Sequence, residues 1–473
     1  MNIGIVCYPT FGGSGVLATE LGLELSRKGH QIHFITYSQP VRLELLSSNV
    51  HFHEVNVPDY PLFHYQPYEL ALSSKLVDMV KAHNIDVLHV HYAIPHAYAA
   101  YMAKKMLHEE GIDVPIVTTL HGTDVTLVGS HPFYKTAVTF SINKSDAVTS
   151  VSQNLKEVTQ RLFNTQKEIK VVPNFIDLEK YKTTHTDCAR DILARPEERV
   201  ITHVSNFRPV KRIADVIDIF YKIQNELPAK LMMVGEGPER KQAEHLCKTY
   251  NIEDKVVFLG NSSEVDKILC FSDLFLLPSE TESFGLAALE AMASGVPVIS
   301  SNSGGIPEVN IEGVSGYLSP VGAIDEMAQN ALKILKEDTT LNTFKHGAQV
   351  TATKFDIHKI AIHHAVGELK IGDKMSFAAM TQKLDDYEEY ESEVWKPVFE
   401  REILRNNHRW WALTKIVKRN EKAYKEPTHL VWNISVLDGK PFVEDDDFIT
   451  KAMRSEKTRN EYRNMSNANE LTL

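Results

Sequence analysis

Two glutamates eight positions apart are the side chains in this sequence best suited to hold a ligand rich in hydroxyl groups. Glu282 and Glu290 flank a run of small and apolar residues at a predicted strand-to-helix junction. Eight positions on a helix make about two turns, so we expect both carboxylates on one side of the helix near its N-terminus. Each can accept hydrogen bonds from hydroxyl groups, while the amides of Phe284, Gly285 and Leu286 point outward. The alternative is a capping glutamate beside a solvated one.

Cations follow a predicted strand in the same half of the chain. Arg208 and Lys211 lie directly after the apolar run Val200–Val204. A planar arginine fork and a lysine point charge both suit a diphosphate, which makes these residues candidates for an anion site. The alternative is a pair of solvated surface cations, and Arg212 fits a structural role better.

A glycine-rich turn follows the first predicted strand. Gly12, Gly13, Ser14 and Gly15 open a predicted helix at Val16–Lys28. Glycines let the backbone approach a ligand closely, and a helix N-terminus offers amides to an anion. The spacing differs from the G-x-G-x-x-G of dinucleotide enzymes. A tight turn without a ligand is therefore the alternative.

Histidines supply a further candidate group. His121 directly follows a predicted strand and could donate a hydrogen bond to a ligand oxygen. His51 and His53, like His89 and His91, are two positions apart and so share a strand face. Neither pair has a third ligand at a fitting spacing in the sequence, which favours packing over a zinc site. We expect no metal.

Short apolar runs alternate with helical patterns in two successive series, which predicts an α/β fold with two Rossmann-like doubly wound domains facing a cleft. The first series of strands is predicted at Ile3–Tyr8, His33–Thr36, Val87–His91, Ile116–Leu120 and Ala147–Val151. The second is predicted at Lys170–Val172, Val200–Val204, Leu231–Val234, Val256–Leu259, Leu274–Leu277 and Val296–Ser300. We therefore place the domains at residues 1–169 and 170–355, followed by a helix at 356–372 and an appended region at 373–473.

Composition and charge limit the class of protein. The chain has 473 residues, of which 43% are hydrophobic and 24% charged, as expected for a soluble protein of two or three domains. A formal net charge of -11 argues against nucleic-acid binding. The four cysteines are scattered, and the N-terminus enters a predicted strand without a signal-like segment. We expect a cytoplasmic location.

The last hundred residues differ from the rest in composition. All four tryptophans fall after residue 390, and Trp410 and Trp411 lie beside Lys415, Lys418 and Arg419. This pattern could form an amphipathic helix at a membrane surface. It could equally form a helical lid or a dimer contact, and packing of this kind is favoured over membrane contact. The sequence leaves open whether the protein forms a homo-oligomer.

Taken together, these motifs resemble those of the retaining glycosyltransferases of GT-B architecture that carry Glu-x7-Glu. Three more motifs follow in the group's order, at Val234–Pro238, Ser303–Val309 and Gly313–Leu318. The resemblance covers residues 1 to about 360. Within this group, four segments resemble the transferases that move N-acetylglucosamine from UDP-GlcNAc to L-malate in bacillithiol biosynthesis, namely Cys7–Pro9, His33–Thr36, His89–His96 and Val204–Arg208.

The resemblance implies roles for the predicted donor-site residues of both domains. Glu290 would hold the ribose hydroxyls of UDP, and Glu282 with the Phe284 and Gly285 amides would hold the sugar. Arg208, Lys211 and the Gly13–Gly15 loop would neutralise the diphosphate as it leaves. His121 would contact the transferred sugar. The departing phosphate oxygen would take the acceptor's proton on the same face, which yields retention. No tightly bound cofactor is implied.

The acceptor site is less completely specified. Tyr92, Thr119, Ser14 and Arg42 are candidates for binding L-malate, with structural roles as the alternative. Related enzymes carry an arginine near Thr139 that this chain lacks, which leaves one malate contact unaccounted for. A lipid or glycan acceptor, or a sugar-nucleotide-binding protein without turnover, are the alternative functions.

Overall fold

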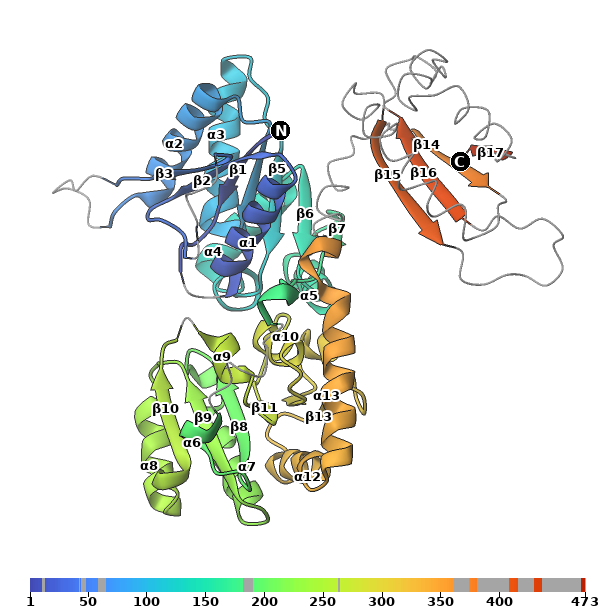
Figure 1. Ribbon diagram of the computed structural model, residues 1–473. Coiled ribbons are helices and arrows are strands. Elements are labelled where there is room, and N and C mark those ends of the chain that lie inside the picture. The colour runs from blue at the N-terminus through green and yellow to red at the C-terminus, as the bar shows by residue number, and fades with distance from the viewer. Residues whose placement is uncertain are drawn as a thin grey trace. The chain divides into compact units, whose positions relative to one another are not determined.

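The computed structural model describes residues 1–10, 13–41, 43, 48–57, 65–181, 190–262 and 264–360, together with the backbone of four strands after residue 373 (Figure 1). The chain divides into two compact units, Met1–His364 and Ala365–Leu473. The first unit contains two parallel sheets and the second an antiparallel sheet. No described helix combines the length and apolar character needed to span a bilayer.

The first sheet has seven parallel strands in the order β3-β2-β1-β4-β5-β6-β7. The strands are β1 (Asn2–Val6), β2 (Gln31–Thr36), β3 (Val50–Glu54), β4 (Val87–His91), β5 (Ile116–Leu120), β6 (Ala147–Ser150) and β7 (Ile169–Val171). The order runs outward from β1 in both directions. This doubly wound arrangement places a ligand beyond the carboxyl ends of the strands, where the order reverses.

Helices cover both faces of this sheet, which explains why its central strands β1, β4 and β5 are buried along almost their whole length. They are α1 (Gly13–Arg27), α2 (Tyr68–His83), α3 (Tyr98–Glu109), α4 (Pro132–Lys144) and α5 (Gln153–Phe163). Ile3 and Ile5 pack with α1 on one face. Val6 and Leu88 pack with α2 and α3 on the other.

The second sheet repeats the same topology with six parallel strands in the order β10-β9-β8-β11-β12-β13. The strands are β8 (Arg199–Val204), β9 (Ala229–Val234), β10 (Val256–Gly260), β11 (Leu274–Leu277), β12 (Val298–Ser301) and β13 (Gly316–Ser319). The helices are α6 (Arg190–Leu193), α7 (Ile213–Gln224), α8 (Arg240–Tyr250), α9 (Val265–Leu269), α10 (Leu286–Ala293), α11 (Ile306–Val309), α12 (Ile324–Leu335) and α13 (Asp338–Ala352).

One strand belongs to the other sheet from the one predicted. The sequence placed Lys170–Val172 at the start of the second domain, but β7 pairs with β6 and closes the first sheet. A boundary between residues 169 and 170 therefore cuts through the last strand of the first domain. The chain passes to the second domain through the segment that follows, which includes a 3-10 turn at Leu178–Tyr181.

The end of the second domain returns to the first at residues 357–360. Residues 357–360 are helical, and Ile357 and Ile360 are buried with the β1 and α1 side chains. The Ile357 amide donates to the Ile176 carbonyl at 2.9 Å, and His358 contacts Glu24 of α1 at 3.0 Å. The helix predicted beyond residue 360 lies outside the described residues.

The second unit holds a four-stranded sheet in the order β15-β16-β14-β17. Its strands are β14 (Lys374–Met380), β15 (His408–Lys415), β16 (His429–Ser435) and β17 (Asn469–Thr472). Trp410 and Trp411 lie in β15, where Trp411 pairs with Asn433 of β16. The helix predicted around these tryptophans is therefore wrong, because aromatic residues at adjacent positions suit a strand at least as well.

Candidate active site

The β11–α10 loop carries the predicted glutamate pair, but in a different geometry from the one expected. Helix α10 begins at Leu286, and Gly285 precedes it with φ 97°, a left-handed conformation that suits glycine. Glu282 therefore lies in the loop, and Glu290 lies in the second turn of the helix. The expectation that one helical face carries both carboxylates is wrong. They are held by two different pieces of backbone.

Close backbone packing fixes this loop. The Gly305 amide donates to the Glu282 carbonyl at 2.8 Å. A Cβ atom on Gly304 would lie 2.0 Å from the same carbonyl oxygen, so only glycine fits there. The Phe284 ring is buried against Phe355 at a centroid distance of 5.5 Å. The loop therefore holds its side chains and the N-terminal amides of α10 in place before a ligand arrives.

An ion pair joins two of the predicted site residues. Lys211 follows β8, and its Nζ atom contacts Glu282 Oε1, which also accepts a hydrogen bond from Ser279 Oγ at 3.0 Å. The two charged side chains are only 20% and 14% exposed, so this is a largely desolvated pair. Arg208 is exposed at the same strand end. Two cations and one carboxylate thus lie together at the carboxyl ends of β8 and β11.

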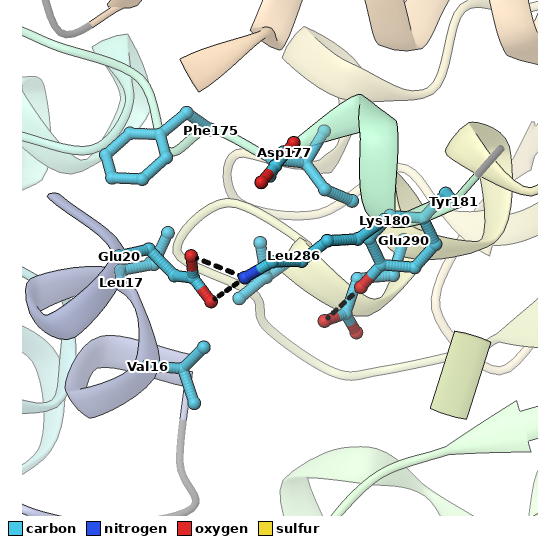
Figure 2. Close-up of a pocket in the computed structure, with 10 residues that line it drawn as sticks. Val16, Leu17, Glu20, Phe175, Asp177, Lys180, Tyr181, Leu286 and Glu290 are labelled. Carbon is cyan, nitrogen blue, oxygen red and sulfur yellow. Dashed lines mark hydrogen bonds and ion pairs between the residues drawn. The ribbon is translucent and has the colours of Figure 1, made fainter. Parts of the chain in front are cut away.

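Glu290 borders a pocket between α1 and α10, into which the connecting segment inserts (Figure 2). The Tyr181 hydroxyl donates to Glu290 Oε1 at 3.2 Å. Lys180 Nζ contacts both carboxylate oxygens of Glu20 on α1, at 2.6 and 2.7 Å. Leu286 supplies part of the apolar wall. Sequence reasoning missed Glu20, Lys180 and Tyr181, because nothing in their spacing links them to the glutamate motif.

The predicted glycine turn lies at the N-terminus of α1, facing the start of α10. A Cβ atom on Gly13 would lie 3.2 Å from the Leu286 side chain. A Cβ atom on Gly15 would lie 2.4 Å from the Tyr8 carbonyl oxygen, so this glycine is needed for the tight turn after β1. Gly12 lies outside the described residues. Two helix N-termini therefore approach one another here, an arrangement that favours an anion between them.

His121 lies at the carboxyl end of β5 and is bonded to a second histidine. His121 Nε2 and His91 Nδ1 are 2.8 Å apart, and their rings stack. Burial, together with the nearby His89 and His96, lowers the pKa of His121 from 6.5 to about 3. The imidazole is therefore neutral at physiological pH. It can form a hydrogen bond but does not act as a protonated acid.

The strand end beside His121 touches the β11–α10 loop directly. Gly122 has φ 117°, and a Cβ atom there would lie 1.6 Å from Ser283 Oγ. Only glycine allows this approach. His121 of the first domain and Glu282 of the second are each one residue away from this contact, so the two residues come close to one another across the cleft.

Tyr92 shares this region with His121. It follows β4 with φ 82°, an uncommon conformation for a residue with a side chain. Its hydroxyl lies 2.9 Å from Ser14 Oγ, and its ring lies 5.2 Å from that of His121. Burial raises its pKa to about 12, so the hydroxyl stays protonated. Tyr92 and Ser14 thus present neutral hydroxyl groups where the first domain meets the cleft.

Two other acceptor candidates are not placed at this surface. Thr119 is buried, and its hydroxyl is already shared with His89 Nε2 and Thr149 Oγ1, each at 2.8 Å. This network between β4, β5 and β6 corrects the prediction that Thr119 binds the acceptor, and it favours the structural alternative. Arg42 lies outside the described residues.

Asp124 organises the strand ends, and sequence reasoning gave it no role. One carboxylate oxygen accepts from the amides of His121 and Gly122, at 3.2 and 2.9 Å. The other accepts from the Ala93 amide at 3.0 Å. The side chain is 2% exposed, and burial raises its pKa. Its position three residues after His121 was the available signal, since a carboxylate there can bond the turn's amides.

Contacts across the cleft hold the two domains together. The Glu308 carboxylate accepts from the Gln153 and Asn154 amides, both at 2.8 Å, at the N-terminus of α5. Ser152 Oγ donates to the Ser283 carbonyl at 2.6 Å. One apolar cluster runs from α4 and α5 into α10 and α13. The domain interface is therefore built beside the site, and Glu308 is a further residue whose role was missed.

Comparison with known proteins identifies the family. Residues 11–180 match the family model described as Glycosyltransferase Family 4, and residues 187–350 match Glycosyl transferases group 1. The chain is also 49% identical over 339 residues to the N-acetyl-alpha-D-glucosaminyl L-malate synthase of Bacillus anthracis, covering 72% of this chain and 88% of that one. This chain belongs to the glycosyltransferase family. It is a sugar-transferring enzyme, as the sequence predicted.

Solved structures confirm the architecture of this glycosyltransferase. HepE of Anabaena in complex with UDP-glucose matches with a TM-score of 0.65 and 21% identity, over 78% of this chain and 100% of that one. Sucrose-phosphate synthase of Thermosynechococcus elongatus matches with a TM-score of 0.65 and 20% identity, over 77% and 97%. The predicted GT-B fold of the first unit is therefore confirmed.

Proposed function

We propose that this glycosyltransferase moves N-acetylglucosamine from UDP-GlcNAc to the hydroxyl of L-malate, with retention at the anomeric carbon. The observation that carries the proposal is the 49% identity, over 339 residues, to a relative named N-acetyl-alpha-D-glucosaminyl L-malate synthase. The site geometry is compatible with it, since neutral hydroxyls and desolvated charges meet at the strand ends of both domains.

The donor's nucleotide would bind between α1 and α10. Glu290 is positioned by Tyr181 to accept hydrogen bonds from the ribose hydroxyls. The diphosphate would lie between the two helix N-termini, near Arg208 and Lys211. Such prearranged donors stabilise the charge that develops on a leaving group, and loss of one of them typically lowers kcat about 10²- to 10³-fold.

The transferred sugar would lie between Glu282 and His121. Because His121 is neutral, it would serve as a hydrogen-bonding partner for a sugar hydroxyl, and the acceptor's proton needs another destination. In the proposed step the bond from the anomeric carbon to the phosphate oxygen breaks, and the malate oxygen bonds to the same face. The released phosphate oxygen takes the malate hydroxyl proton. Catalysis is then mostly positioning and electrostatic stabilisation.

The acceptor would bind on the first-domain side of the cleft. Tyr92 and Ser14 offer hydroxyl groups there. Malate also needs a cation for its carboxylates, and Arg42 is the candidate that the sequence supplies. This assignment of the acceptor contacts stays a prediction.

An acceptor screen tests the proposal. Purified full-length protein is incubated with UDP-GlcNAc and one acceptor per reaction, and the products are identified by mass spectrometry. The acceptors are L-malate, D-malate, lactate, citrate, glycerol and a lipid acceptor. We expect N-acetylglucosaminyl malate with L-malate alone. Equal turnover with a lipid or glycan acceptor and none with L-malate would refute the acceptor assignment while leaving the family intact. Binding of UDP without turnover of any acceptor would favour a non-catalytic protein.

A further inference from the structure

Four histidines gather on the outer part of the first sheet. His33 lies in β2, His51 and His53 lie in β3, and His83 is the last residue of α2. Their ring centroids are 4.6 to 5.2 Å apart in four close pairs. Since α2 ends before β4 begins, this cluster lies toward the amino ends of the strands. The active site lies at their carboxyl ends.

Strand register explains why these side chains meet. His33 pairs with His51, and Ile35 pairs with His53, in the parallel ladder between β2 and β3. Alternate residues of a strand share a face, so all four positions point to the same side of the sheet. Ile35 packs there with apolar side chains of α2, which brings His83 over the two strands. Figure 1 shows α2 lying against this part of the sheet.

We propose that His33, His53 and His83 form a binding site for a divalent transition-metal cation of the zinc type. One ring nitrogen from each of the three histidines lies within 4.8 Å of the other two. Zinc with nitrogen ligands at about 2.0–2.1 Å needs those nitrogens roughly 3.3 Å apart. Closing the largest separation therefore requires a movement of about 1.5 Å at most, which rotation of half-buried rings can supply.

The chemistry of the cluster suits such a cation. Neutral imidazole nitrogen is a preferred ligand of zinc and its neighbours in the first transition row. Burial and the surrounding histidines, together with Lys75 beside His53, lower the pKa of His33 and of His53 to about 4, so both rings keep a lone pair at neutral pH. The hydrogen bond between His33 Nδ1 and His53 Nε2, at 2.9 Å, would be exchanged for two metal bonds. Three protein ligands leave a fourth position for water.

A bound cation would link β3 at the edge of the sheet to β2 and to the end of α2. The site lies outside the donor and acceptor regions, so its proposed role is structural and independent of the transferase reaction. The sequence favoured packing for His51 and His53 because no third ligand had a fitting spacing. The structure supplies His33 and His83 from elements that are distant in the sequence.

Metal titration of the full-length protein tests the proposal. Protein purified without a histidine tag is freed of metal with a chelator, and Zn²⁺ binding is measured by calorimetry, with the zinc-induced shift in Tm as a second readout. The variants are His53→Ala and His83→Ala. His108→Ala is the matched control, because His108 is an exposed histidine in the last turn of α3. His51→Ala tests the neighbour that lies outside the proposed ligand set.

We expect one Zn²⁺ per chain and a rise in Tm for the wild-type protein, the His108→Ala variant and the His51→Ala variant. His53→Ala and His83→Ala should bind Zn²⁺ at least about 10-fold more weakly than the wild type. Removing a residue that only hydrogen-bonds to a metal ligand already lowers metal affinity by about this much, and these variants remove a ligand itself. If circular dichroism shows that either variant is misfolded, His83→Asn is used in its place. This substitution removes the imidazole at the half-buried end of α2. Absence of wild-type binding at micromolar Zn²⁺, or equal binding by all variants, would overturn the proposal.

Discussion

The pair formed by Lys211 and Glu282 gives the sharpest prediction about the donor site. Both side chains are at least four-fifths buried, so removal of either one leaves the other charged and poorly solvated. Leaving one buried charged group without its partner costs about 1–3 kcal/mol of free energy. If both groups also contact the donor, Lys211→Ala and Glu282→Ala should each lower kcat/KM by about 10²- to 10³-fold. The double variant lacks both charged groups, so no unpaired charge remains and this cost is absent.

A double-mutant cycle measures this coupling. Initial rates of UDP release are followed at saturating L-malate for the wild type, the two single variants and the double variant. We expect the loss in the double variant to be smaller than the product of the single losses by about 5- to 150-fold, the equivalent of 1–3 kcal/mol. Glu280→Ala, an exposed carboxylate two positions away, should retain near-normal rates. Strictly multiplicative losses, or wild-type rates in both single variants, would refute the reasoning.

Three further predictions concern other contacts. Tyr181→Phe removes the hydrogen bond to Glu290 and should raise KM for the donor about 3- to 10-fold with little change in kcat, measured by the same assay; an unchanged KM would contradict it. Glu308→Gln weakens the cap across the domain interface and should lower the unfolding free energy by about 0.5–1 kcal/mol in urea titrations; equal midpoints would argue against the contact. Burial holds the pKa of His121 at about 3 and that of His203 at about 4, below the value of 6.5 expected in the unfolded chain. The unfolded state therefore binds more protons below pH 6.5, so stability should be complete above that pH and fall toward pH 4. A urea midpoint that stays constant from pH 7 to 4 would contradict this.

Most of the fold of the first unit follows from the sequence because apolar runs in buried parallel strands are continuous. The edge strand Val50–Glu54 was missed as a strand because histidines interrupt its apolar residues. The strand at Ile169–Val171 was assigned to the wrong sheet, since three residues carry no information about their partner. The Trp410–Trp411 segment was misassigned because adjacent aromatic residues fit helix and strand alike.

The sequence identified individual residues of the candidate site, but it did not predict the contacts between them. The glutamate motif identified Glu282 and Glu290, while the left-handed Gly285 that separates them was not visible in the spacing. Asp124 and Glu308 act through backbone amides, which carry no sequence signal of their own. Contacts between residues more than a hundred positions apart depend on how the two domains meet, and local patterns do not contain that information.

A crystal structure of this glycosyltransferase with UDP-GlcNAc tests the central claim most directly. The account predicts the nucleotide between α1 and α10, with the Glu290 carboxylate on the ribose hydroxyls and Glu282 on the sugar. It also predicts Lys211 within hydrogen-bonding distance of the diphosphate. A donor bound elsewhere, or a complex in which both carboxylates point away from the sugar nucleotide, would contradict it.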